Sequence, residues 1–470
     1  MKKDFLYQEI SQNIARLIKN NVLKAGDRLP SVRMLCTAHG ISMNTAKRVY
    51  LELEGQSLIE SKPQSGYFVS GRQKLLPLPE TSRPLPAGSE EEPEQLIARV
   101  YDNMGKPGLT LFSIGVPDQR LLPVARLNKE MIQATRRLSG GGTAYEELQG
   151  NEKLRLAIAA RSFSWGGSLR EKDIITTAGG MNALSFSMMA VSKPGQTIAV
   201  ESPVYPGILQ LARSLGLRVL ELPTHPRTGI EPDALKKVLP QIHLCLLVTN
   251  FSTPLGSCMP DTHKREVVKL LAERNIPLIE DDLYGDLYFG NSRPSCCKAY
   301  DKTGHVLWCS AVSKTLAPGY RVGWVAPGRY KEQLLQLKLS HAISSSAITQ
   351  EVVAGFLESG RYDHHLRKMR RTLQHNCDHY TQTIAGHFPP GTRTGRPQGG
   401  LTLWVELDKR INTTDLYASA IRQHISIAPG RMFTLQQQFE NCMRLCFGLP
   451  WTDELQRKLQ QLGRIAAMQL

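Results

Sequence analysis

The sequence has no apolar run long enough to cross a lipid bilayer. The best candidate, "HLCLLVTNF" at residues 243–251, has the length of a strand, whereas a membrane-spanning helix needs about 20 apolar residues. The first ten residues, "MKKDFLYQEI", include Asp4 and Glu9 and lack the apolar segment of a secretory signal. We therefore expect a cytoplasmic protein with no membrane partner.

The cysteines lack the spacing of a metal site. The chain has 9 of them, an odd number, and no repeated Cys-x-x-Cys pattern. Several lie in apolar stretches such as "HLCLLV" and "CMRLCFG", which favours buried reduced thiols over disulfides or zinc ligands. Cys442 and Cys446 are interpreted as two residues of one buried element, and we expect no metal ion.

The chain is long and carries a large positive net charge. A chain of 470 residues exceeds the size at which a single core stops growing, so two or more domains are expected. The net charge of +16 suggests an anionic partner. Residues 1–70 hold 10 basic and 6 acidic residues and the rest hold 48 and 36, so charge alone does not locate a nucleic-acid site.

The first seventy residues predict three helices and a hairpin. Apolar residues recur at helical spacing over residues 5–22, and "KAGDRLPS" then breaks the pattern. A second helix is predicted over residues 31–39, and a third over "MNTAKRVYLELE" with Ser42 as its N-cap. "SLIESKPQSGYFVS" predicts two strands around a Pro-Gln-Ser-Gly turn. Together these elements predict a winged helix-turn-helix.

The third predicted helix has a polar face that could reach base edges and phosphates, although a solvated face is the alternative. The stretch "GDRLPSVRMLCTAHGISMNTAKRVYLELEGQSLIESKPQSGYFV" closely resembles the DNA-binding domain of GntR-family transcription regulators. In that family "LPS-x-R-x-L" opens the second helix and a glycine tips the wing. The resemblance implies an operator of double-stranded DNA, contacted in the major-groove region by Arg33, Ser42, Asn44, Thr45 and Lys47 and at the wing by Ser65 and Gly66.

A proline-rich stretch separates this domain from the rest. Residues 71–105 include "RQKLLPLPETSRPLPAGSEEEPEQ" and are predicted to be a linker. After it, the short apolar segments "IITTA", "TIAV", "CLLVTN", "PLIEDD" and "VLWCSA" alternate with helix-length intervals. This pattern predicts an α/β domain with a mostly parallel sheet over residues 106–470.

One lysine of this second domain has an unusual setting. "CSAVSKTLAPGYRVGW" places Lys314 among small residues and Arg321 seven positions later. A lysine that must approach an aldehyde, with an arginine nearby to hold a phosphate, needs such a setting. "TAGGMNAL" adds two glycines between a strand and a helix, where backbone N–H groups can bind a phosphate.

Two further segments could hold a flat ring. "ESPVYPG" places Tyr205 just after a strand, where it could cover a ring, although a lone tyrosine is more often a packing residue. "IEDDLYGDLYF" ends a strand at Asp281, which could pair with a protonated pyridine nitrogen, and Tyr284 could bond a ring hydroxyl. We expect Asp282 to belong to a solvated acidic loop.

Taken in order, these segments resemble the fold-type I pyridoxal 5'-phosphate enzymes of the class I/II aminotransferase family. With its first domain, the chain resembles MocR-type regulators, in which an aminotransferase-like domain follows the GntR winged helix. The resemblance implies these roles: Lys314 as Schiff-base lysine, Asp281 on the pyridine nitrogen, Tyr284 near the ring oxygen, Tyr205 stacked on the ring, Arg321 with Gly179, Gly180 and Met181 on the phosphate, Tyr145 on the phosphate of the partner subunit in a homodimer, and Arg444 with Gly115 at a substrate carboxylate.

Two positions depart from the family pattern. Thr253 stands where the family has an asparagine at the ring oxygen, and Ala311 stands where it has a phosphate-binding serine. We expect cofactor binding to survive, since a missing hydroxyl at a phosphate costs on the order of 1 kcal/mol. Thr253 is expected to tune the cofactor less well, so any transaminase activity is expected to be weak or vestigial.

Three functions remain open from the sequence. The leading hypothesis is a DNA-binding transcription regulator that senses an amino compound through a lysine-linked cofactor. The alternatives are an aminotransferase, which moves an amino group from an amino acid to a 2-oxo acid, and a scaffold without cofactor. For Arg444, the alternative to carboxylate binding is an internal pair with an acidic residue.

The run "RYDHHLRKMRR" carries five cations, Arg361, Arg367, Lys368, Arg370 and Arg371, against Asp363. It predicts a solvated helix face, and the alternative is a secondary contact to DNA that flanks the operator.

Overall fold

A computed structural model describes residues 6–56, 58–62, 65–70, 76–84 and 94–470. The chain divides into two compact units, Met1–Leu75 and Leu76–Leu470, each with its own hydrophobic core. In the described ranges, no helix combines the length and the apolar character needed to cross a membrane.

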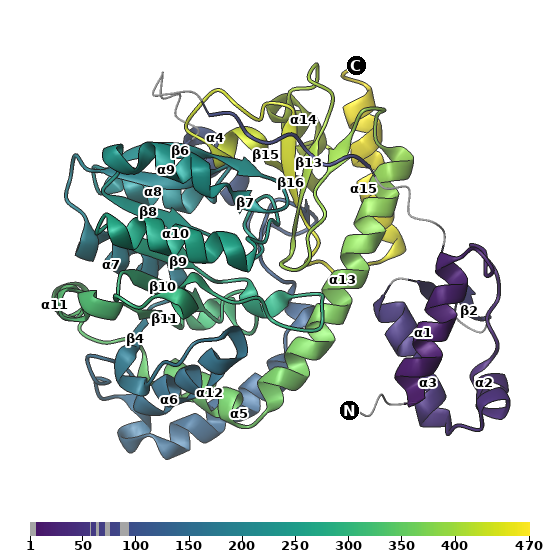
Figure 1. The fold of residues 1–470 in the computed structure, drawn as a ribbon, viewed down its shortest axis with the longest axis horizontal. Coiled ribbons are helices and arrows are strands. Elements are labelled where there is room, and N and C mark those ends of the chain that lie inside the picture. The colour runs from purple at the N-terminus through teal and green to yellow at the C-terminus, as the bar shows by residue number, and fades with distance from the viewer. Residues whose placement is uncertain (1–5, 57, 63–64, 71–75, 85–93) are drawn as a thin grey trace. The chain divides into compact units, whose positions relative to one another are not determined.

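The first unit consists of three helices and a two-stranded antiparallel wing (Figure 1). Its elements are α1 (Leu6–Lys19), α2 (Val32–His39), α3 (Met43–Gly55), β1 (Ile59–Lys62) and β2 (Gly66–Val69). Helix α3 begins where Ser42 Oγ accepts the Thr45 N–H at 3.1 Å. The predicted winged helix-turn-helix is confirmed, while Pro63 and Gln64 of the predicted turn lie outside the described residues.

Helix α3 carries the core of this unit on one face. Ala46, Val49, Tyr50 and Leu53 are completely buried, and their spacing of three or four residues puts them on one side of a helix. The side chains of the opposite face remain exposed. This leaves one polar surface of α3 free for a partner.

The second unit is built on an eight-stranded sheet. Its strands follow the spatial order β4 (Ile175–Thr177), β11 (Gly323–Ala326), β10 (Val306–Ala311), β9 (Leu278–Asp281), β8 (Leu244–Leu247), β5 (Thr197–Ser202), β6 (Arg218–His225) and β7 (Gly229–Ile230). The run from β10 to β6 is parallel, and β11 and β7 are antiparallel to their neighbours. The expected mostly parallel sheet is confirmed.

Both faces of this sheet are covered. In β8, Leu244 and Leu246 belong to one core cluster, and Cys245 and Leu247 belong to another. Since successive residues of a strand point to opposite faces, the two clusters lie on opposite sides of the sheet. The surrounding helices are α4 (Glu94–Tyr101), α5 (Val124–Arg137), α6 (Glu152–Ser162), α7 (Gly180–Val191), α8 (Pro206–Ser214), α9 (Pro232–Val238), α10 (Asp261–Glu273), α11 (Lys331–His341) and α12 (Ala347–Glu358).

A smaller lobe follows the long helix α13 (Arg361–His387). Figure 1 shows α13, in green, running from beside α12 to beside α15. The lobe contains a four-stranded antiparallel sheet, a short parallel pair and two helices: β12 (Arg393–Thr394), β13 (Thr402–Glu406), β16 (Cys442–Cys446), β15 (Ala428–Pro429), β14 (Ile425–Ser426) with β3 (Thr110–Leu111), α14 (Thr413–Ile421) and α15 (Asp453–Ala467). Cys442 and Cys446 are buried in β16, as predicted.

Part of the predicted linker is bound to the second unit. The Thr394 N–H donates to Pro77 O at 3.0 Å, and the Ser82 hydroxyl accepts the Thr224 N–H at 2.8 Å. Helix α4, inside the same predicted range, also belongs to this unit. The division between the two units falls between Leu75 and Leu76, and the predicted domain limits stay predictions.

Candidate functional site

A cavity of about 120 Å³ lies in the second unit beside the carboxyl ends of β9 and β10. These two strands are parallel, with Asp281 in register with Cys309, so the loops that follow them leave the same edge of the sheet. Eight of the eleven lining residues were predicted from the sequence. The lining comprises Gly180, Met181, Leu184, Tyr205, Thr253, Asp281, Leu283, Tyr284, Ser313, Lys314 and Arg321.

A larger open groove of about 540 Å³ lies along Phe289, Gln374 and Asp378. None of the residues that the sequence singled out as site residues lines it, so the smaller cavity is the candidate site.

Lys314 is one of the residues that line the cavity. Its Nζ donates to Gly115 O at 2.7 Å and lies 5.9 Å from the centre of the Tyr284 ring. Burial, and then the positive charge of Arg444, lower the pKa of Lys314 to about 8. A lysine with such a pKa is neutral in an appreciable fraction of molecules near neutral pH and can attack a carbonyl group.

Asp281 ends β9 with its carboxyl group buried. Burial, and then the negative charge of Asp282, raise the pKa of Asp281 to about 7, while Lys314 opposes the shift. The backbone N–H of Leu283 also lowers it. A cationic ring nitrogen bound in the cavity would favour the ionised carboxylate.

Two buried polar atoms near the cavity have no hydrogen-bond partner in the part of the chain that the structure describes. They are Thr253 Oγ1 and Arg444 Nε. One Arg444 nitrogen donates to Ser113 O, and no acidic side chain of the described residues pairs with this guanidinium. The described residues therefore give no support to the internal pair considered for Arg444, and its role at a carboxylate stays a prediction.

The other end of the cavity is suited to an anion. Helix α7 begins at Gly180, after Gly179 with φ of 92°. A Cβ on Gly179 would lie 2.4 Å from Arg321 Nη2, so only glycine lets the arginine approach this helix terminus. Arg321 itself is exposed and in the left-handed region with φ of 53°, a strained conformation that concentrates at functional sites.

The set of residues fits pyridoxal 5'-phosphate. The unpaired Thr253 hydroxyl is available to a ring oxygen, the amine of Lys314 to an aldehyde, and the α7 terminus with Arg321 to a phosphate. Ala311 offers no hydroxyl there. Ser313, which sequence reasoning missed, lines the cavity one residue before Lys314.

Two residues that the sequence predicts for the site, Tyr145 and Gly115, are not among those that line the cavity. Tyr145 does not line the cavity, and it is 81% exposed in this single chain. Gly115 contacts the site through Lys314, and a Cβ on it would lie 3.4 Å from Arg444 Nη1. Sequence reasoning missed Tyr101 of α4, whose hydroxyl donates to the Tyr205 hydroxyl at 3.4 Å, because the residues lie far apart in the chain.

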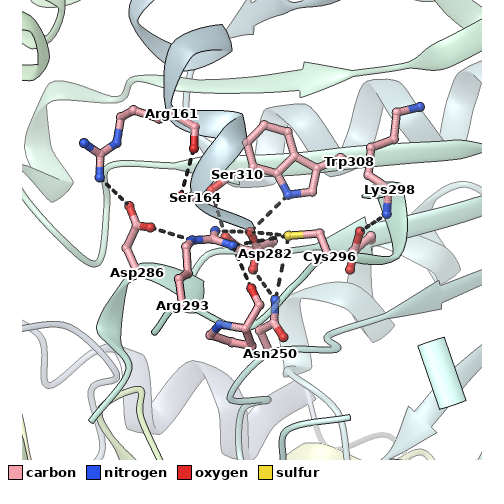
Figure 2. A network of polar contacts seen from close by, with 12 residues as sticks. Arg161, Ser164, Asn250, Asp282, Asp286, Arg293, Cys296, Lys298, Trp308 and Ser310 are labelled. Atoms are coloured by element: carbon pink, nitrogen blue, oxygen red, sulfur yellow. Dashed lines mark hydrogen bonds and ion pairs between the residues drawn. The ribbon is translucent and has the colours of Figure 1, made fainter. Parts of the chain in front are cut away.

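Asp282 was expected in a solvated loop, and this expectation is wrong. Its side chain is buried at the centre of the polar network in Figure 2. Arg293 links Asp282 to Asp286, and Asp286 also pairs with Arg161. The further donors to the Asp282 carboxylate are Asn250 Nδ2, Cys296 Sγ and Trp308 Nε1.

The first unit presents its predicted DNA-contact residues at one end of α3 and at the wing. Asn44 and Lys47 are exposed, as is Arg33 on α2. Ser42 is exposed too, but its hydroxyl is occupied in capping α3, where it also contacts Thr45 Oγ1 at 2.8 Å. Ser65 and Gly66 are exposed in the wing, next to the guanidinium of Arg28.

Comparison with known proteins covers both units. Residues 6–69 match the family described as "Bacterial regulatory proteins, gntR family", and residues 107–461 match "Aminotransferase class I and II", a family that uses pyridoxal phosphate. The uncharacterised HTH-type transcriptional regulator YjiR of Escherichia coli is 36% identical over 97% of this chain and 98% of its own length. A second E. coli regulator of this kind, YdcR, is 33% identical over 99% of both chains.

Among solved structures, the kynurenine aminotransferase of Pyrococcus horikoshii has the fold of the second unit. Its TM-score is 0.74 at 22% identity, over 81% of this chain and 96% of that protein. Since the regulators match along their whole length and the aminotransferase only in the second unit, the regulator architecture defines the chain. It belongs to the MocR-type HTH transcriptional regulators, in which a GntR-family DNA-binding domain precedes a class I and II aminotransferase domain.

Proposed function

We propose that this regulator senses an amino compound at Lys314 with the help of pyridoxal 5'-phosphate, and that the first unit binds operator DNA. The observation that carries the proposal is the pairing of a reactive lysine with unpaired polar atoms around one cavity. Lys314 has a lowered pKa, and Thr253 Oγ1 and Arg444 Nε have no partner among the described residues. Buried polar groups are nearly always paired, so such atoms indicate a missing ligand.

Each residue has a distinct task in this proposal. Lys314 would hold the cofactor through its amine, and the cofactor would supply an aldehyde that an amino compound can react with. Asp281 holds the proton on the pyridine nitrogen, and Tyr205 covers the ring. Tyr284 and Thr253 hold the ring oxygen. The phosphate is held by Arg321, by the amides of Gly179, Gly180 and Met181, and by Tyr145 of the partner subunit.

The effector carries both an amine and a carboxylate. Its amine would compete with the Lys314 amine for the cofactor's aldehyde, and its carboxylate would bind the guanidinium of Arg444, a planar group suited to bidentate pairing. Gly115 lies beside Arg444 at that end of the site, and its carbonyl oxygen accepts the hydrogen bond from Lys314. Release of the Lys314 amine is the change to which the regulator responds.

The protein acts as a homodimer through the second unit. Tyr145 supports this, because its side chain is 81% exposed in the single chain and is therefore available to a partner subunit. A monomer at micromolar concentration with full cofactor occupancy would contradict the proposal.

An absorbance titration tests the cofactor assignment. The protein mixed with pyridoxal 5'-phosphate should develop the near-visible band of a lysine-bound cofactor, and Lys314→Ala should abolish it. Lys338→Met is the matched control, because Lys338 is also buried with its pKa lowered to about 8 but lies outside the cavity. An unchanged band in Lys314→Ala would remove Lys314 from the role.

Aminotransferase activity is the second candidate function. The simultaneous presence of Lys314, Asp281 and Arg444 around one cavity favours it. Thr253 and Ala311 weaken the two ends of the cofactor site. A steady release of 2-oxo acid from amino acids, abolished by Lys314→Ala, would identify turnover, whereas a spectral change without product would leave sensing alone.

A further inference from the structure

The basic run of α13 separates into two kinds of cation. Arg361 pairs with Glu130 at 3.1 Å. The Arg370 guanidinium lies 4.0 Å from the centre of the Tyr288 ring and donates to Asp286 O at 3.3 Å. These two arginines therefore hold α13 against the rest of the unit.

Three other cations of the run have no such task. Arg367, Lys368 and Arg371 are exposed, and within residues 94–470 and the other described ranges their charged groups form no ion pair or hydrogen bond. The acidic residue of the run, Asp363, pairs with Arg161 at 2.9 Å and leaves them uncompensated. Arg371 lies three residues after Lys368 and four after Arg367, so the three lie on one face of the helix, which we call the α13 stripe.

The surroundings of the stripe are also positive. His365 lies on the buried side of α13, where burial lowers its pKa. The charges of Arg126 and Lys368 lower that pKa further. Since Arg126 is exposed on α5, a second element adds a cation to the same region.

The chemistry of the stripe selects a polyanion. Among the described residues of α13, no large apolar side chain is exposed, so the face lacks the apolar contacts of a membrane-surface helix or a protein interface. Arg367 and Arg371 are about 6 Å apart along the helix axis. Duplex DNA carries about one negative charge per 1.7 Å of its axis, so several phosphates fall within that length.

We propose that the α13 stripe binds the phosphate backbone of duplex DNA beside the sequence held by the first unit. The proposal rests on the proposed DNA binding by the first unit. Once that unit has bound, neighbouring phosphates are present at an effective concentration on the order of millimolar, so a few weak contacts suffice. The aminotransferase-like unit is then itself a DNA-contacting surface.

The experiment measures the salt dependence of binding to two duplexes. A duplex recovered by selection from a random-sequence library with the full-length protein is prepared as its core alone and with about 20 bp of flanking DNA on each side. The test variant is Arg367→Gln/Arg371→Gln. The matched control, Lys236→Gln/Lys237→Gln, removes two exposed cations of α9 whose charged groups form no ion pair or hydrogen bond among the described residues.

On the flanked duplex, the test variant should bind about tenfold more weakly near 0.1 M salt. The slope of log affinity against log salt should flatten by about 1.8, because each lost phosphate contact removes about 0.9. Binding to the core duplex should not change, and the α9 variant should match the parent on both.

Equal affinities of parent and test variant on the flanked duplex would overturn the proposal while leaving operator binding by the first unit intact. An equal loss in the α9 variant would also overturn it, since a general charge effect would then suffice. A parent that binds no duplex would contradict operator binding itself, and the stripe proposal with it.

Discussion

Asp281 and Asp282 are adjacent and both buried, yet they belong to polar clusters of opposite kinds. The Asp282 carboxylate receives hydrogen bonds from Asn250, Arg293, Cys296 and Trp308 (Figure 2). No side chain of the described residues donates a hydrogen bond to Asp281, which lines the cavity instead. We call the Asp282 cluster complete, because its hydrogen-bond donors all lie within the chain. We call the Asp281 cluster open, because it lines a cavity and has few donors.

The difference indicates that the Asp282 cluster stabilises the fold, whereas the Asp281 cluster is suited to binding a ligand. A buried carboxylate with all its acceptors filled needs no ligand, and its network stabilises the loop after β9. A buried carboxylate with few donors, in the same cavity lining as the unpaired Thr253 hydroxyl, leaves acceptor positions that a ligand can fill. The variants below test the two clusters separately.

The largest effect is expected from breaking the complete cluster. Arg293→Met leaves the Asp282 carboxylate buried without its cation, and removing one partner of a buried pair costs about 3–5 kcal/mol. The free energy of unfolding of the cofactor-free protein, followed by tryptophan fluorescence in urea, should fall by that amount. Adding Asp282→Asn to the same chain should recover part of the loss. A change below about 1 kcal/mol in Arg293→Met would mean that the network does not stabilise the fold.

A pH-dependent effect on stability is expected from Glu201, whose pKa responds to the charge of Asp281. Burial raises the pKa of Glu201 to about 8, and the charge of Asp281 adds to the rise, while the Val248 N–H opposes it. The neutral acid is thus favoured in the folded protein, so stability falls as pH rises from about 4.5 to 8. Glu201→Gln should remove this loss. Relative to the parent, it should gain more than about 2 kcal/mol in unfolding free energy between pH 5 and pH 8. Parallel pH profiles of the two proteins would contradict the assignment.

Arg444→Lys sharpens the comparison at the ligand end of the open cluster. The cofactor band should persist, and amino acids should perturb it with at least tenfold weaker affinity, equivalent to about 1.4 kcal/mol. Simple amines without a carboxylate should act alike on the variant and the parent. If amino acids also act alike on both, the effector must be sought among amines without an acid group.

The smallest effect on stability is expected from Thr253→Val. Because the Thr253 hydroxyl has no partner among the described residues, its loss should change the unfolding free energy of the cofactor-free protein by less than about 1 kcal/mol. Cofactor affinity should fall several-fold. Thr249→Val is the control, since the Thr249 hydroxyl donates to Glu280 Oε1 at 2.6 Å, and its loss should cost about 1–3 kcal/mol. Equal losses in the two variants would mean that Thr253 is paired within the protein.

Much of the fold follows from local patterns. The Ser42 N-cap, the helices of the first unit and the five predicted strand segments all depend on neighbours in the chain, and the structure has each of them. Strand β6 lacks the signal of the predicted strands, because its sequence mixes polar with apolar residues whereas they are apolar runs. The bound segment 76–84 was interpreted as linker because its prolines hide its long-range contacts to Thr394 and Thr224.

By itself, the sequence determined that Lys314, Asp281 and Tyr284 follow strand ends, because short apolar segments mark where strands stop. It assigned Asp281 to a ring nitrogen but placed Asp282 in a solvated loop, since nothing in the acidic run shows that Asp282 is buried. Only the tertiary structure decided that one lines a cavity and the other pairs with Arg293. It also decided which cations of α13 are paired, because that depends on Glu130 and Tyr288, which are distant in the chain. Electrostatic pairing acts over a few ångströms in space, and only folding brings such partners within that range.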